Sequence, residues 1–110
     1  MAVSDQNVTD ALTYLAADPH PIAVARFNLT MAENKSRETF AKLFLGSNAT
    51  TNDAKKASAE SNSEYVAVKQ TEAECVLELE RHRARTKAAD MLIECWRTEQ
   101  SNIRAAERVR

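Results

Sequence analysis

Four cationic side chains in the second half of the chain have the types and spacing that could bind a ligand. They are Arg81, Arg83, Arg85 and Lys87. Four cations within two helical turns can straddle phosphates, and such binding weakens steeply with salt. On a helix, however, Glu78–Arg81 and Glu80–Arg83 have the i,i+3 spacing of surface ion pairs. The cluster therefore leaves two interpretations, a nucleic-acid contact and, favoured by this spacing, a solvated helix face.

The other titratable residues form no catalytic or metal-binding pattern. His20 and His82 have no Cys or His neighbours at the spacing of zinc ligands, so we expect no metal site. His82 is expected to be buried and hydrogen-bonded, with some pH sensitivity. Cys75 lies among glutamates, which disfavour a reactive thiolate. Without a Gly-rich phosphate loop or a recognisable pocket, we predict no enzyme activity and no cofactor.

The composition predicts an all-α chain with few connections. One Gly and two Pro among 110 residues leave little turn chemistry. The formal net charge of −1 gives no bulk attraction to nucleic acid or to an anionic membrane. No apolar run approaches the roughly 18 residues that a membrane span needs. The length suits a single domain over residues 1–110.

The cysteines and the N-terminus predict a reducing compartment. Cys75 and Cys95 stand on one predicted helix at a separation of roughly 30 Å, too far for a disulfide bond. The opening residues MAVSDQNVTD lack the basic and apolar layout of a signal peptide. We therefore expect a cytoplasmic location. The glycosylation patterns at Asn7, Asn28 and Asn48 are then expected to be coincidental.

The first half of the chain predicts two helices separated by a Pro-rich bend. The first covers about 5–17, with Ser4 available as its cap. The second covers about 22–45 and ends at Gly46, which we expect to adopt a left-handed C-cap conformation. The polar stretch 33–38 leaves open whether this second element is one helix or two.

The second half of the chain predicts one very long helix over about 52–108, a stretch without Gly or Pro. It carries a heptad-like ladder with steps of three and four, which predicts a packing seam. The ladder comprises Tyr65, Val68, Glu72, Cys75, Leu79, His82, Thr86, Ala89, Ile93, Trp96, Gln100 and Ile103. All except Glu72, Thr86 and Gln100 are predicted self-association residues. Trp96 is expected to pack against a helix rather than to bind a foreign partner.

The length of this helix predicts self-association. Packed antiparallel, the helix 22–45 reaches only to about residue 77, so the apolar side chains beyond need another cover. Residues 1–20 can cover only part of them, whether they dock in cis or swap between copies. Leaving such side chains in water costs about 1.5–3 kcal/mol each. We therefore predict a homodimer, an all-α helical hairpin that forms a coiled-coil-like bundle on dimerisation. A monomeric three-helix hairpin is the alternative.

The order of charges favours one direction of pairing. Residues 60–80 hold six glutamates and one lysine, a net charge of −5, whereas residues 81–87 carry +4 with His82 neutral. In a parallel pair, each charged segment lies next to the same segment of the second copy. In an antiparallel pair centred near Leu77, the acidic segment of one copy lies next to the basic segment of the other. Repulsion between like blocks helps to specify direction, so we favour the antiparallel pair.

The stretch AADMLIECWRTEQSNIRAA, residues 88–106, resembles the end of small helical accessory proteins encoded by tailed phages and prophages. Phe40-Ala-Lys-Leu-Phe-Leu, followed by a later Tyr65-x-x-Val-Lys helix, extends the likeness to about two thirds of the chain. The resemblance implies a bacterial host cytoplasm and brings no catalytic residues.

Two functional hypotheses follow. In the first, a phage-type accessory protein binds an unidentified protein partner stoichiometrically, as an adaptor or an inhibitor, through an elongated helical dimer. In the second, a nucleic-acid-binding accessory of phage recombination or replication uses the basic cluster 81–87.

Overall fold

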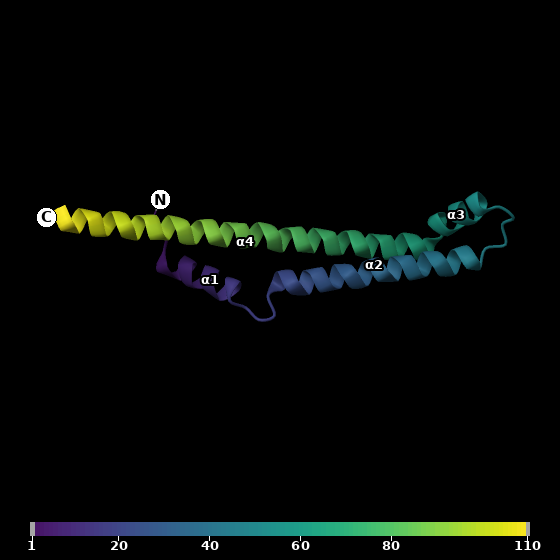
Figure 1. Ribbon diagram of the computed structural model, residues 1–110, viewed down its shortest axis with the longest axis horizontal. Coiled ribbons are helices and arrows are strands. Elements are labelled where there is room, and N and C mark those ends of the chain that lie inside the picture. The colour runs from purple at the N-terminus through teal and green to yellow at the C-terminus, as the bar shows by residue number, and fades with distance from the viewer. Residues whose placement is uncertain (1, 110) are drawn as a thin grey trace. The chain divides into compact units, whose positions relative to one another are not determined.

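The computed structural model describes residues 2–109, which form four α-helices and no strand (Figure 1). The helices are α1 (Asp5–Leu15), α2 (Pro21–Leu45), α3 (Asn52–Ser61) and α4 (Ser63–Val109). The predicted all-α fold with a very long C-terminal helix is confirmed. Across the described residues, no helix combines the length and the apolar character needed to cross a membrane.

Contacts group the chain into two compact units, where the sequence predicted a single domain. The hairpin unit comprises Ala23–Glu80, and the terminal unit comprises the described residues up to Ile22 and from Arg81 onward. The helix α4 contributes its first part to the hairpin unit and the remainder to the terminal unit.

The ends of helix α1 are set by a capping side chain at Ser4 and by the Pro-rich bend that follows the helix. The Ser4 side chain accepts a hydrogen bond from the Asn7 backbone N–H at 3.1 Å and caps the first turn. The helix ends at Leu15, two residues before the predicted end. Ala17 donates to the Tyr14 carbonyl in a tighter final turn ahead of the Pro-rich bend.

The helix α2 is one continuous helix through its polar middle, because polar residues there lie on its packing face. Ser36 and Thr39 are buried together with Ala25 and Ala32. The predicted left-handed cap at Gly46 is wrong, since no glycine in residues 2–109 has a positive φ. Gly46 instead continues the helical bonding, with its N–H donating to the Lys42 carbonyl at 3.0 Å.

The predicted single helix 52–108 is divided at Asn62 into α3 and α4. Asn62 has extended backbone angles, φ −66° and ψ 134°, and its side-chain oxygen accepts from the Glu64 N–H at 2.8 Å. It therefore caps α4 and ends α3. Ser, Asn and Ser in succession at 61–63 offer side-chain bonds that compete with the helix, which is the physical reason for the break.

In the hairpin unit, α2 packs antiparallel to the first part of α4 through small side chains. Phe40 contacts Tyr65 with ring centroids 5.6 Å apart, and further along α2 the Ser36 hydroxyl contacts Glu72. Because the buried α2 residues are Ala, Ser and Thr, the two helices can approach closely. The short helix α3 adds Ala59, which is almost completely buried.

In the terminal unit, α1 lies against the C-terminal part of α4 of the same chain. Its buried residues are Val8, Ala11 and Tyr14. The Glu99 carboxylate accepts the Val3 N–H with both oxygens at 3.1 Å. The N-terminal residues therefore dock in cis in this structure.

The predicted seam of α4 is a packing face, but much of it packs on the same chain. Leu79 and Ala89 are buried, the half-buried residues are Tyr65, Val68, Cys75, His82, Ile93 and Trp96, and Ile103 is exposed. The Val68 carbonyl and the Tyr65 ring contact α2, and His82 contacts α1. These three residues thus contact α2 and α1 of the same chain, and their part in self-association stays a prediction.

Candidate functional site

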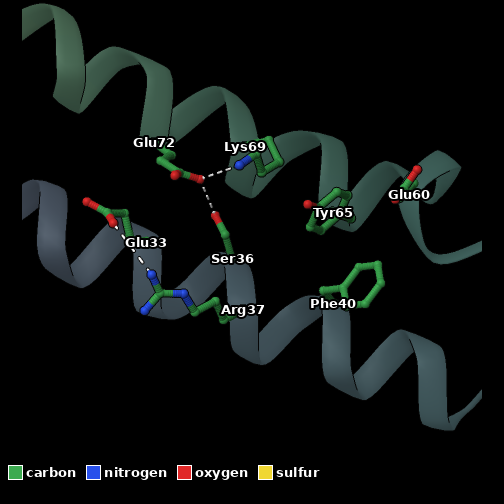
Figure 2. A pocket seen from close by; sticks show the side chains of 8 residues that line it. All are labelled: Glu33, Ser36, Arg37, Phe40, Glu60, Tyr65, Lys69 and Glu72. Carbon is green, nitrogen blue, oxygen red and sulfur yellow. Dashed lines mark hydrogen bonds and ion pairs between the residues drawn. The ribbon is translucent and has the colours of Figure 1, made fainter. Parts of the chain in front are cut away.

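A cavity of about 480 Å³ opens in the hairpin unit beside the contact of α2 with α4 (Figure 2). Its lining residues are Glu33, Ser36, Arg37, Phe40, Glu60, Tyr65, Lys69 and Glu72. The helix α2 supplies four of them, α3 supplies Glu60, and α4 supplies the last three. The Phe40 and Tyr65 rings lie next to each other, and the other lining residues are Ser36 and charged side chains.

A charged hydrogen-bond group links α2 to α4 in this cavity (Figure 2). The Glu72 carboxylate accepts from Lys69 Nζ at 2.8 Å and from the buried Ser36 Oγ at 2.9 Å. The hydrogen bond from Lys69 lowers the pKa of Glu72, and the bond from Ser36 acts in the same direction. The same Lys69–Glu72 bond raises the pKa of Lys69.

These pKa directions describe a structural ion pair. A general base that activates a serine needs a raised carboxylate pKa or a lowered lysine pKa. The lowered pKa makes Glu72 a weaker base and the raised pKa keeps Lys69 protonated, so both shifts favour the charged forms of the pair. Sequence reasoning placed Glu72 on the seam but missed Ser36, whose only signal was a small residue in the polar middle of α2.

A second cluster in the terminal unit surrounds Tyr14, which is only 6% exposed. The Tyr14 hydroxyl donates to the His82 carbonyl at 3.1 Å and lies 3.2 Å from His82 Nδ1. Thr86 Oγ1 lies 3.4 Å from the same hydroxyl and donates to the His82 carbonyl at 2.9 Å. The expected hydrogen-bonded His82 is thus present, half-buried. Helical spacing of apolar residues indicates Val8, Ala11, Leu12 and Leu15 as the packing positions of α1 and does not include Tyr14. The structure buries Val8, Ala11 and Tyr14 and leaves Leu12 exposed.

The predicted basic cluster lies on α4 with its side chains exposed. Arg85 covers the Tyr14 ring, with its guanidinium carbon 4.1 Å from the ring centroid. Arg81 and Arg83 each interact with another group of the chain. Lys87 is exposed. Three of the four cations therefore have interactions within the chain, and both interpretations of the cluster stay predictions.

Both thiols are free, as expected from their separation, with Cys75 half-buried and Cys95 exposed. In the range 2–109, no group of three or more His, Cys, Asp and Glu side chains is arranged to hold a metal ion.

Three large apolar side chains are exposed on α2. Val24, Phe27 and Met31 recur at steps of three and four and are 42%, 64% and 53% exposed. We call these three residues the α2 stripe. They lie on the outer side of α2 because Ala25, Ala32 and Ser36 form its inner face.

Comparison of the sequence and structure with protein-family models, with curated proteins and with solved structures finds no match to this chain.

Proposed function

We propose that this chain is an accessory protein of the phage type that works by stoichiometric binding to a protein partner, as an adaptor or an inhibitor. In this proposal the helices are a scaffold that presents apolar and charged surfaces. Self-association into a homodimer is part of the same proposal, and no reaction is assigned to the chain.

The proposal rests on one observation. The buried apolar residues are mostly small, whereas several large apolar side chains are exposed. Among residues 2–109, five of the eight buried apolar residues are alanines, and Leu79 is the only buried leucine. Phe27, Leu45 and Met91 are 64%, 82% and 59% exposed. Apolar side chains of this size gain about 1.5–3 kcal/mol each when they leave water. Exposed apolar surface of this kind is typical of a protein that buries part of its surface against a partner.

Capture from a bacterial lysate with the tagged full-length chain tests this proposal. We expect a foreign protein to be retained in about equimolar amount and to be lost when one exposed apolar residue becomes charged, in Phe27→Asp, Leu45→Asp or Met91→Asp. Failure to retain any protein near equimolar amount contradicts the proposal. Retention that is unchanged in all three variants contradicts it as well.

Binding to nucleic acid through residues 81–87 is the second candidate function. The observation that favours it is the net charge of +4 within seven residues, all but His82 and Thr86 exposed. A titration against single- and double-stranded DNA separates the candidates. Absence of binding at about 50 mM salt rejects this function, and salt-sensitive binding that is lost in Arg81→Ala/Arg83→Ala/Arg85→Ala supports it.

A further inference from the structure

A second groove of the hairpin unit runs between α2 and α4 on the side of the α2 stripe, and its volume is about 160 Å³. Its lining residues are Ala25, Asn28, Thr71, Glu74, Cys75 and Glu78. Val24 precedes Asn28 by four residues and Met31 follows it by three, so helical spacing places both beside the α2 wall of the groove. The groove and the α2 stripe therefore form one continuous surface.

This surface is apolar on the α2 side and acidic on the α4 side. The α4 wall carries Glu74 and Glu78, within a segment whose residues 60–80 have a net charge of −5. Such a surface fits a helix that presents apolar side chains next to cations, because grooves bind amphipathic helices through apolar anchors and choose among them by charge.

The chain itself carries a helix of this chemistry in the other part of α4. Ala84, Ala88 and Met91 recur at steps of four and three and are all exposed, with Met91 at 59%. Arg81 and Lys87 lie beside them, within the segment of net charge +4. We propose that the groove and the α2 stripe of one copy bind residues 81–91 of a second copy. This inference rests on the proposed function, of which it names the self-association surface.

In a two-fold symmetric dimer this contact is made twice, because each copy offers both surfaces. Glu74 of one copy then faces Lys87 of the other. Exposed ion pairs add little affinity, so the apolar contact holds the dimer together and the charges select partner and direction. This contact also places the acidic residues 60–80 of one copy next to the basic residues 81–87 of the second copy.

The solution mass of the full-length protein, measured by sedimentation equilibrium at about 50 mM salt, tests the apolar part of the contact. We expect a dimer for the unmodified chain and at least a roughly tenfold weaker association for Phe27→Asp. Leu45→Asp is the matched control, since Leu45 is an exposed apolar residue at the far end of the same helix. Equal weakening by the two substitutions overturns the proposal.

Two variants with reversed charges test whether Glu74 of one copy lies next to Lys87 of the other. Glu74→Lys sets lysine against Lys87, and Lys87→Glu sets glutamate against Glu74, so we expect each variant alone to associate roughly tenfold more weakly. Mixing the two restores attraction at both contacts, and a dimer containing one copy of each is expected. Helical content measured by circular dichroism checks that both variants fold. A mixture that associates no better than its components overturns the proposal.

The two proposals fail separately. An unmodified chain that stays monomeric overturns this inference and the dimer of the proposed function, while equimolar capture of a foreign protein by that monomer still supports stoichiometric binding to a partner. A dimer that captures no foreign protein supports this inference and contradicts binding to a foreign partner.

Discussion

The hairpin unit and the terminal unit hold their helices to α4 by different means. In the hairpin unit, the 25-residue α2 approaches α4 through small side chains and is fixed by the charged group of Ser36, Lys69 and Glu72. In the terminal unit, the 11-residue α1 is fixed by the hydrogen bonds around Tyr14 and by the carboxylate of Glu99.

Because of this difference, we expect the two units to respond differently to substitutions. A helix of 11 residues is marginal on its own, so the order of α1 depends on its docking. Its buried side chains are Val8, Ala11 and Tyr14, of which Tyr14 is by far the largest. The longer α2 distributes its contacts over many positions. We therefore expect α1 to open at a lower free energy than α2, and to depend on one residue.

Tyr14→Ala is expected to have the largest effect and to separate the two units. Loss of the buried ring should cost about 3–5 kcal/mol in the stability of the terminal unit. Hydrogen exchange of the α1 amides, measured residue by residue, should then accelerate while the α2 amides keep their protection. Tyr14→Phe, which removes only the hydroxyl, should cost about 1 kcal/mol. Unchanged exchange of α1 in the alanine variant contradicts the dependence on Tyr14.

Ala25→Leu tests the close approach of α2 to α4. Ala25 is 3% exposed and lies at the contact with α4 next to the small groove, so a leucine is expected to crowd α4, at a cost of about 1–3 kcal/mol. The midpoint of urea unfolding measures this cost. Ala23→Leu, two residues away at an exposed position, should change stability by less than about 0.5 kcal/mol. If both substitutions are tolerated equally, α2 and α4 are not closely packed at Ala25.

Asn62→Ala tests the break between α3 and α4, which only the hairpin unit contains. Removal of the side-chain bond to the Glu64 N–H should cost about 1 kcal/mol in chemical denaturation. Ser63→Ala, at the neighbouring position, is the control and should cost less. A variant as stable as the unmodified protein indicates that α3 and α4 can join into one helix.

The smallest expected effect is the pH dependence of the stability that Glu72 and Lys69 contribute to the hairpin unit. Such a dependence distinguishes this ionic contact from the hydrogen bonds around Tyr14 in the terminal unit. Because the pKa of Glu72 is lowered from 4.5, its contribution is complete above that pH and is lost as the pH falls through the lowered value. Because the pKa of Lys69 is raised from 10.5, its contribution is complete below that pH and is lost as the pH rises through the raised value.

Between these limits the Glu72–Lys69 contribution should be constant. The measurement is the difference in thermal stability between the unmodified protein and Glu72→Gln across pH. This difference should shrink in acid, where Glu72 is protonated in both folded and unfolded chains. A difference that stays constant down to about pH 2 contradicts the assigned cause.

Much of the fold could be predicted from local patterns. The capping residue Ser4, the Pro-rich bend and the heptad-like ladder of α4 depend only on neighbouring residues, and they located three of the helices and the packing face of α4. The break at Asn62 was missed because Ser and Asn are only weakly unfavourable inside a helix, so the break depends on side-chain bonds that the pattern does not show.

The sites were harder to predict because they join residues distant in sequence. Ser36 meets Glu72 only after α2 packs on α4, and Tyr14 meets His82 across 68 positions. The ladder identified which face of α4 packs but not what covers it. On α2, helical spacing does indicate Ala25 and Ala32 as packing positions, and both are buried. Hydrophobicity alone did not show that Phe27 lies outside the contact, where it is 64% exposed.

The most direct measurement is the mass in solution of the unmodified protein beside that of Phe27→Asp. If the exposed side of α2 is an interface between copies, the first should have the mass of two chains and the second the mass of one at the same concentration. A single-chain mass for the unmodified protein, or a double mass that persists in Phe27→Asp, contradicts this claim.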